Sequence, residues 1–155
     1  MIFVDFRKAF DSVQRGKLMK ILKAYGVPSE MVSAINMLYI NTVAKVISPD
    51  GETTFFQILA GVLQGDTLAS YLFIISLDYA MRLATFNKEE LGFTLKPTRS
   101  RRNPAEVITD TDFADDIALL SNTLRQAEEL LHRTQDAAKQ IGLHINENKT
   151  SFLMK

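Results

Sequence analysis

Residues 110–122 read DTDFADDIALLSN, and the fold of the chain can be worked out from this short stretch. It places four aspartates, Asp110, Asp112, Asp115 and Asp116, directly before a run of apolar residues. The pattern around Ala-Asp-Asp predicts a β-hairpin whose arms are residues 106–113 and 117–122, with the adjacent acids at or near its turn. Neighbouring carboxylates repel each other and lose hydration beside an apolar strand, so a third partner is expected, most simply a metal ion.

Strands and helices are predicted to alternate on both sides of this hairpin. Short β-branched or aromatic runs predict strands at residues 2–6 and 92–96, an early hairpin at 43–48 and 53–58, and a last hairpin at 143–146 and 149–154. Apolar residues at helical spacing predict helices at about 15–24, from Pro28 onward, at 68–86 and at 124–141. This order predicts an α+β fold of the ferredoxin-like kind, in which helices pack on one face of a mainly antiparallel sheet.

The composition excludes several classes of protein. The 155 residues suffice for one domain with a real core, and the absence of cysteine excludes disulfides and thiolate metal sites. Two histidines argue against an imidazole zinc site, and a net charge of zero argues against a wholly basic surface. Asp78 and Arg82 interrupt the longest apolar run, which is therefore interpreted as a buried helix and not a membrane span. No targeting segment is evident, and we expect an intracellular protein, with nucleus and cytoplasm both open.

A further acid, Asp5, follows the first predicted strand. In a ferredoxin-like sheet this strand can lie beside a later hairpin, which would bring Asp5 close to Asp115 and Asp116. Carboxylates of this kind suit Mg²⁺ or Mn²⁺, and two such ions can assist an in-line phosphoryl transfer. The alternative is that the adjacent acids form an ordinary solvated turn or a helix cap.

Four blocks of sequence resemble the catalytic core of a reverse transcriptase, specifically that of non-LTR (LINE-type) retrotransposons. FVDFRKAFDSV (3–13) is similar to the first palm motif, and GVLQGDTLASYLFII (61–75) to the second, with Ser70 where proline is usual. FADDIALL (113–120) resembles the Tyr-Ala-Asp-Asp box with Phe113 in place of tyrosine, and IGLHINENKTSF (141–152) resembles the fourth block. Four blocks in the family's order argue against chance. Group II intron and retron enzymes share the fold and are a less favoured alternative.

The resemblance implies roles for the acids and for one aromatic ring. Asp5 and Asp115 would bind both catalytic ions, two Mg²⁺ or Mn²⁺, and Asp116 would complete the acidic cluster. Phe10 matches the position of a bulky ring that excludes the ribose 2′-hydroxyl and so selects deoxynucleotides. Without the resemblance, Phe10 would be interpreted as an aromatic core residue.

The resemblance also implies contacts with the incoming nucleotide. Gln64 and Gly65 match a loop that lies against nucleotide and template, where glycine permits close backbone approach; simple turn geometry would explain the glycine equally well. Lys149 matches a lysine that protonates the pyrophosphate leaving group, although a solvated surface lysine is the common alternative. Arg7 and Lys8, beside the first acid, could meet the triphosphate.

Two basic clusters are candidates for contact with the phosphate backbone of a nucleic acid. One consists of Arg99, Arg101 and Arg102, in the loop before the acidic hairpin. The other is formed by Lys17, Lys20 and Lys23, three residues apart on the first long helix. Charged faces of this kind are as often simply solvated, and the sequence leaves both interpretations open.

The resemblance implies an RNA-directed DNA polymerase core that extends a primer with deoxynucleoside triphosphates on an RNA or DNA template. Residues 1–155 would form a single palm domain with part of the fingers at about 15–60, and the N-terminal fingers, the thumb and the endonuclease are expected to be absent. Uncovered sheet edges and apolar surface predict a homo-oligomer, domain-swapped forms included. The alternative is a palm fragment that folds and self-associates without polymerase activity.

Overall fold

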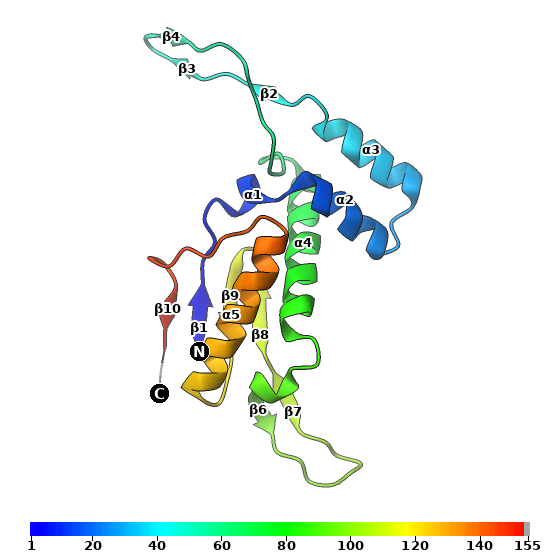
Figure 1. Cartoon of the computed structure of the whole chain (residues 1–155), viewed down its shortest axis with the longest axis vertical. Helices are drawn as coiled ribbons and strands as arrows, with labels where there is room; N and C mark the ends of the chain where they lie inside the picture. Colours follow the sequence, from blue (N-terminus) through cyan, green and yellow to red (C-terminus); the bar gives the residue numbers. More distant parts are fainter. Residues whose placement is uncertain (154–155) are drawn as a thin grey trace.

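The centre of the molecule is a four-stranded antiparallel sheet in the order β10-β1-β9-β8 (Figure 1). The computed structural model describes residues 1–153. The strands are β1 (Ile2–Val4), β8 (Asp110–Phe113), β9 (Asp116–Leu119) and β10 (Ser151–Phe152). Val4 pairs with Ile117 and Phe3 with Ala118, so the first strand lies directly beside the acidic hairpin. This pairing and the predicted α+β class are both confirmed.

Within residues 1–153, helices cover one face of this sheet and leave the other open. Successive strand residues point to opposite faces, and the residues that face the core, each at most 3% exposed, are Ile2, Val4, Ile117 and Leu119. Helices α4 (Thr67–Thr85) and α5 (Leu124–Gln140) lie over this buried face (Figure 1). On the other face Phe3 is 45% exposed. A strand buried on both faces was expected at residues 2–6. The strand is buried on the face of Ile2 and Val4 and open to solvent on the face of Phe3, so the expectation is wrong for that second face.

The two long helices begin where side-chain caps satisfy their first backbone N–H groups. The Asp66 carboxylate accepts a hydrogen bond from the Leu68 N–H at 3.0 Å, and the Thr123 hydroxyl accepts one from the Gln126 N–H at 3.3 Å. Both caps lie where the sequence predicts them. Within the described residues, no helix, α4 included, is long and apolar enough to cross a membrane.

The first arm of the acidic hairpin is shorter than predicted. Residues 110–113 pair with β9, whereas β7 (Glu106–Ile108) pairs with β6 (Phe93–Lys96) in a separate two-stranded ribbon. The second arm cannot continue beside β7, because the Asn122 side chain donates hydrogen bonds to the Gly92 carbonyl at 3.0 Å and to the Thr94 hydroxyl at 3.1 Å. A short 3-10 helix (Glu89–Leu91) leads from α4 into this ribbon.

The predicted last hairpin does not form. Ile145 bridges to Phe6 and β10 pairs with β1, so both segments follow the first strand and do not pair with each other. The cause is a helical turn, in which the Asn146 carbonyl accepts from the backbone N–H of Lys149 at 3.1 Å and of Thr150 at 2.9 Å. This turn carries the chain onward without reversing it. Residue 154, at the end of the predicted hairpin, lies outside the described residues.

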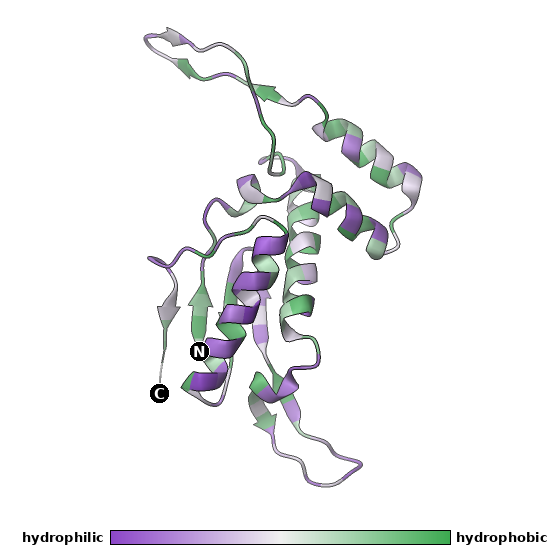
Figure 2. Ribbon diagram, viewed as in Figure 1, coloured by the Kyte–Doolittle hydropathy of each residue, from purple (hydrophilic) through white to green (hydrophobic). Residues whose placement is uncertain are grey.

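Three helices and a long hairpin extend beyond the sheet. Their elements are α1 (Ala9–Ser12), α2 (Arg15–Ala24), α3 (Ser29–Tyr39), β2 (Val43–Ala44), β3 (Ile47–Ser48), β4 (Gly51–Glu52) and β5 (Phe56–Gln57). We call residues 40–60 the arm. It projects away from the sheet (Figure 1), and apolar residues lie on its strands β2 and β3 (Figure 2). The hairpin predicted around Pro-Asp-Gly-Glu is confirmed, although its pairing is interrupted between the two short ladders.

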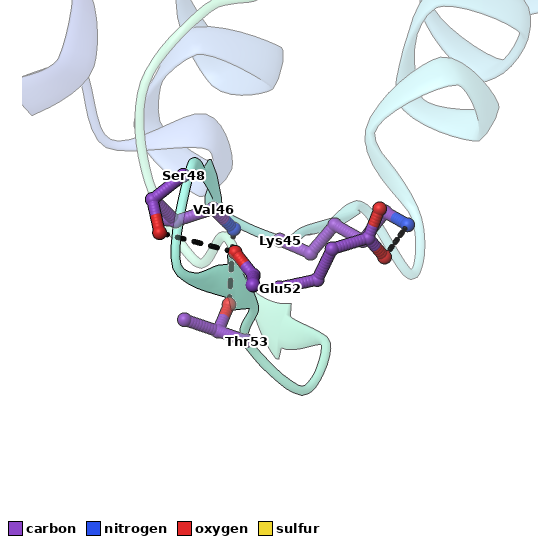
Figure 3. Close-up of polar contacts among 6 residues, drawn as sticks. Lys45, Val46, Ser48, Glu52 and Thr53 are labelled. Carbon is purple, nitrogen blue, oxygen red and sulfur yellow. Dashed lines mark hydrogen bonds and ion pairs between the residues drawn. The ribbon is translucent and has the colours of Figure 1, made fainter.

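The tip of the arm is held by its own polar groups (Figure 3). The Val46 N–H donates to the Thr53 hydroxyl at 2.9 Å, and the Thr53 N–H returns a bond to the Val46 carbonyl at 3.0 Å. The Ser48 hydroxyl donates to the Gly51 carbonyl at 3.1 Å, and Lys45 forms an ion pair with Glu52. These contacts fix the turn locally, without help from the rest of the molecule.

Candidate active site

An open cavity of about 610 Å³ lies on the uncovered side of the sheet. Its lining includes Phe3, Asp5, Thr111, Phe113, Asp116 and Lys149. Asp5 follows Val4 and Asp116 precedes Ile117, so the two acids occupy the next opposed position of the β1–β9 ladder. The pairing of these strands therefore places two of the three predicted acids at one cavity.

Asp5 is held by the segment that follows α5. Its backbone carbonyl accepts from the Asn146 N–H at 2.7 Å, and its carboxylate accepts from the Asn146 side-chain amide at 3.0 Å. The Lys149 ammonium lies 3.9 Å from the other carboxylate oxygen of Asp5. Lys149 thus lies beside Asp5, and its role toward the leaving group stays a prediction. Asn146 received no separate role from the sequence, and its place three residues before Lys149 in the fourth block is the signal that could have identified it.

Asp115 lies outside the cavity lining, in the two-residue turn between β8 and β9. The turn is closed by the pairing of Phe113 with Asp116, and Ala114 takes a left-handed φ of 56°. Asp115 and Asp116 are both exposed to solvent.

Two carboxylates at one cavity are suitable donors for Mg²⁺, which takes one or two and completes its shell with water and phosphate oxygens. No group of three or more acidic or histidine side chains lies close enough together to hold a metal ion anywhere in residues 1–153. The donor chemistry of Asp5 and Asp116 therefore fits the ion, while the predicted gathering of all three acids is not seen.

A second acidic group lies around Asp112, which lines the same cavity at the edge of the sheet. Burial, followed by the negative charges of Asp110 and of Asp78 on α4, raises the pKa of Asp112 to about 6. Desolvation and like charges both disfavour the ionised form of a carboxyl group. The sequence assigned no role to Asp110 or Asp112.

Phe10 packs in the helical layer and does not line the cavity. Its ring stacks on that of Phe73 in α4, with centroids 4.5 Å apart and planes 18° apart. Phe73 is fully buried, and Phe10 is partly buried against the same core. This position agrees with an aromatic core residue, and the exclusion of ribose by Phe10 stays a prediction.

The glycine loop before α4 uses its two glycines differently. The Gly61 N–H donates to the Val13 carbonyl at 2.8 Å, and a Cβ at Gly61 would lie 2.7 Å from the Asp11 backbone. Gly65 has a φ of 92°, but a Cβ there would meet no atom within 4 Å. Gly61 therefore packs closely against the protein's own backbone, whereas Gly65 has open space beside it and a φ that favours glycine. The contact of Gly65 with nucleotide and template stays a prediction. Gln64 is exposed beside it.

Arg15 joins the arm to the rest of the molecule, a function that the sequence did not indicate. Its guanidinium donates to the carbonyls of Gly61 at 2.8 Å, Tyr39 at 3.1 Å and Ile58 at 2.8 Å. It also donates to the Thr42 hydroxyl at 2.6 Å, and it lies 5.0 Å from the centroid of the Tyr39 ring. Burial lowers the pKa of Arg15. A cation at the first position of a helix opposes the helix dipole, and this is the signal that could have indicated a special role.

The other predicted basic residues do not line the carboxylate cavity. Arg7 and Lys8 line a second cavity. Arg99, Arg101 and Arg102 are exposed in the loop between β6 and β7, at the opposite end of the molecule from the arm (Figure 1). Their contact with nucleotide or nucleic acid stays a prediction.

An acid-ended strand paired with an acid-tipped hairpin, on a sheet covered by helices on one face, is the arrangement expected of a palm domain. The chain belongs to the reverse transcriptase (RNA-dependent DNA polymerase) family, whose match extends over residues 1–155.

Retrotransposon proteins are among its relatives. The chain is 30% identical over 146 residues to the retrovirus-related Pol polyprotein from type-2 retrotransposable element R2DM of Drosophila melanogaster, covering 94% of this chain and 13% of that protein. Pol polyproteins from type-1 retrotransposable element R2 are similarly related, at 30% over 147 residues in Bradysia coprophila (95% and 16%) and 28% over 153 residues in Popillia japonica (99% and 24%). The resemblance to non-LTR retrotransposon enzymes is therefore confirmed, and the chain spans at most about a quarter of the length of these relatives.

Proposed function

We propose that this chain is the palm-domain core of an RNA-directed DNA polymerase, which extends a primer with deoxynucleoside triphosphates on an RNA or DNA template. The observation that carries the proposal is the opposed placement of Asp5 and Asp116 at one cavity, with Lys149 beside Asp5. The cavity is open, and it lies on the face of the sheet that no helix covers. A primer end and a nucleotide can approach the acids only from such a face.

Asp5 and Asp115 would bind two Mg²⁺ or Mn²⁺ ions, and Asp116, which lies opposite Asp5 at the cavity, would complete the acidic set. When bound, such a pair of ions activates the attacking oxygen and neutralises the charge on the leaving group. The residues of this chain position the reactants: Asn146 fixes the Asp5 carboxylate, and Lys149 holds a proton at its ammonium nitrogen near the acids. We also assign about residues 15–60 to the fingers, with Gln64 and Gly65 facing the incoming nucleotide.

Primer extension by the purified chain on an RNA template with Mg²⁺ tests this proposal. Asp116→Asn and Asp115→Asn should each lower extension by about a hundredfold or more, the loss typical when a charge-stabilising group is removed from an active site. Asp50→Asn, which removes an exposed acid from the turn of the arm, is the matched control and should extend normally. Extension that survives Asp116→Asn would contradict the proposal.

A palm without polymerase activity is the second candidate. It is favoured by the absence, among the described residues, of a cluster of three acids, and by the hydrogen bond that already occupies the Asp5 carboxylate. If the wild-type chain is folded and still fails to extend a primer, the inactive palm is the correct candidate.

Self-association is proposed for both candidates. Within the described part of the chain β8 has no strand on its outer side, and an unpaired edge can accept a strand from a second copy. Exchange of the arm between copies would produce a domain-swapped oligomer. Light scattering that gives a monomeric mass at micromolar concentration would contradict this.

A further inference from the structure

Helix α3 is apolar on more than one face, and only one of these faces is buried. The face that packs into the core is at most 8% exposed and is formed by Val32, Ile35 and Tyr39. Met31, Met37 and Leu38 lie on other sides of the helix and are 56%, 71% and 54% exposed. A helix that is apolar around most of its circumference is normally covered by protein on all of those sides, so the outer face of α3 has the composition of an interface.

A groove between α2 and α4 is open as well. It consists of two adjoining cavities, of about 300 and 420 Å³, which share Ala24 and Tyr79. The larger cavity also contains Leu83 and Phe86, which are 38% and 69% exposed. We call the two cavities together the α2–α4 groove. Its larger cavity offers mainly apolar and aromatic surface.

The polar groups of the larger cavity already have partners. The Asp78 carboxylate accepts a hydrogen bond from the Tyr25 hydroxyl at 2.5 Å and one from the Arg82 guanidinium at 2.7 Å. Tyr25 and Arg82 both line the cavity, so these bonds fix its edge in the free molecule. A partner can therefore cover the apolar surface without first breaking polar contacts.

The smaller cavity carries uncompensated positive charge. Lys17 and Lys20 line it, and the ion pairs among residues 1–153 involve other cations. The C-terminal end of α5, at Gln140, opposes the two lysines with about half a negative charge, which leaves an excess of roughly +1.5. The groove as a whole suits a partner that is apolar along its length and acidic at one end.

Helix α3 has this chemistry. Glu30 lies in its first turn, is exposed, and takes part in none of the ion pairs of residues 1–153. The full negative charge of Glu30 exceeds the half positive charge of the helix N-terminus. Glu30 and Leu38 are roughly 12 Å apart along the helix axis, and Tyr79 and Phe86 on α4 are roughly 10 Å apart. One helix can thus place its acid at the lysines and its apolar residues over the larger cavity.

We propose that the outer face of α3 packs into the α2–α4 groove of a second copy of this chain. The buried face of α3 is fixed in the core of its own copy, so the exposed face is presented outward to another molecule. A third helix laid into a groove between two helices is a common way of burying an amphipathic helix. A nucleic-acid backbone would satisfy the lysines and leave the apolar cavity uncovered.

When two copies exchange this contact, each α3 fills the groove of the other and the assembly closes as a two-fold dimer. The contact gives the self-association proposed above a defined surface, separate from the edge of β8 and from exchange of the arm. It rests on that proposed self-association and does not depend on polymerase activity.

Sedimentation equilibrium of the whole chain, from low micromolar to sub-millimolar concentration, tests the proposal. The wild type should pass from monomer to dimer. Phe86→Ser in the groove and Leu38→Ser on α3 should each weaken dimerisation about tenfold or more, as expected for apolar residues at the centre of an interface. Ile74→Ser removes an apolar side chain of α4 that is 48% exposed and lines neither cavity, and it should leave dimerisation unchanged.

A charge exchange provides a test that misfolding cannot imitate. Lys20→Glu and Glu30→Lys should each weaken dimerisation up to about fivefold, the upper range for one exposed charge pair. A chain that carries both substitutions should return close to the wild-type affinity, because the two charges have changed places across the interface.

Mixing two variants distinguishes this contact from the other modes of self-association. The Phe86→Ser chain keeps an intact α3 and the Leu38→Ser chain keeps an intact groove, so the mixture should associate more tightly than either chain alone. Pairing at the edge of β8, or exchange of the arm, would give no such gain. All masses are measured without template, primer or metal ion, so failure of this contact and failure of the polymerase proposal are distinguishable.

Four results would each overturn the proposal. They are a monomeric wild type over the whole concentration range, dimerisation that neither serine variant weakens, no recovery in the charge exchange, and dissociation of the dimer by a short oligonucleotide. The last result would assign the lysines to nucleic acid.

Discussion

The sheet with its helices and the arm are built on different principles. In the sheet and its two covering helices, alternate strand residues and whole helix faces are excluded from water, and the core is continuous from Ile2 to Ile145. In the arm, none of residues 40–60 is buried, and Ile47, Phe55 and Leu59 are 69%, 68% and 81% exposed. Burial of apolar side chains thus stabilises the sheet and its helices, whereas hydrogen bonds, four of them from Arg15, stabilise the arm. The arm should accordingly open at a lower free energy than the sheet.

Matched leucine truncations should give the largest contrast between the two regions. Leu130→Ala removes a side chain that is 0% exposed in α5 and should lower the free energy of unfolding by about 2–5 kcal/mol. Leu59→Ala, in the arm, should change it by no more than about 0.5 kcal/mol. Urea denaturation followed by circular dichroism measures both. A similar loss in the two variants would show that the arm packs against something in solution.

Gly61→Ala tests the point at which the arm rejoins the sheet region. The new Cβ would lie 2.7 Å from the Asp11 backbone and would adopt a φ of 84°, so we expect a loss of about 2–4 kcal/mol from strain and overpacking together. Gly65→Ala carries similar backbone strain with open space around it, and should cost about 1–2 kcal/mol. Thermal unfolding of the two variants separates the steric clash, present only in Gly61→Ala, from the backbone strain that both variants share. Equal losses of stability in the two variants would rule out the close contact between residue 61 and Asp11.

Arg15→Met should loosen the arm and spare the sheet. The substitution removes four hydrogen bonds that the guanidinium donates, and all four acceptors lie in or beside the arm. We expect the free energy of unfolding to fall by about 1.5–3 kcal/mol. Hydrogen exchange should accelerate in residues 40–60 and stay unchanged in β1 and β9. Arg101→Met, in an exposed loop, is the control. Uniform acceleration across the molecule would mean that Arg15 supports the whole fold.

Asp112 should give the smallest effect, at the edge of the sheet. Its pKa of about 6 lies above the ordinary value near 4, so the folded state binds the proton more tightly than the unfolded state. The stability that Asp112 contributes is therefore full below pH 4 and is lost as the pH rises through 6. Because Asp112 is only partly desolvated and keeps contact with water, solvent screening limits this loss to at most about 1 kcal/mol. Asp112→Asn should flatten the pH dependence of the melting temperature between pH 4 and 7. Asp50→Asn is the control. If Asp112→Asn leaves that pH dependence unchanged, the raised pKa of Asp112 is contradicted.

The sequence predicted the local elements well because their signals are local. The α4 and α5 helices carry caps at Asp66 and Thr123, and the arm hairpin carries its turn residues at Pro-Asp-Gly. The neighbourhood of Asp5 and the acidic hairpin could also be predicted, because the family resemblance and the sheet architecture agree on it.

What the sequence missed depends on contacts between distant segments. The hydrogen bonds of Arg15 join residues that are far apart in the chain, and nothing near Arg15 indicates its partners. β10 pairs with β1 and not with residues 143–146 because of one helical turn at Asn146, which no periodicity predicts. The position of Asp115 outside the cavity follows from the length of a two-residue turn, since its neighbour Asp116 takes the inward place.

That two-residue turn also limits how the chain can tolerate insertions. One residue added between Phe113 and Asp116 would shift the register of β9 or bulge it, and a shift by one turns every side chain to the opposite face of the sheet. Asp116 would leave the cavity, and Ile117 and Leu119 would leave the core. The turn of the arm at Pro49 and Asp50 has no such constraint, because neither face of that hairpin is buried. A fluorophore, an affinity tag or a small inserted domain therefore belongs at residues 49–50, while the acidic turn should keep its length.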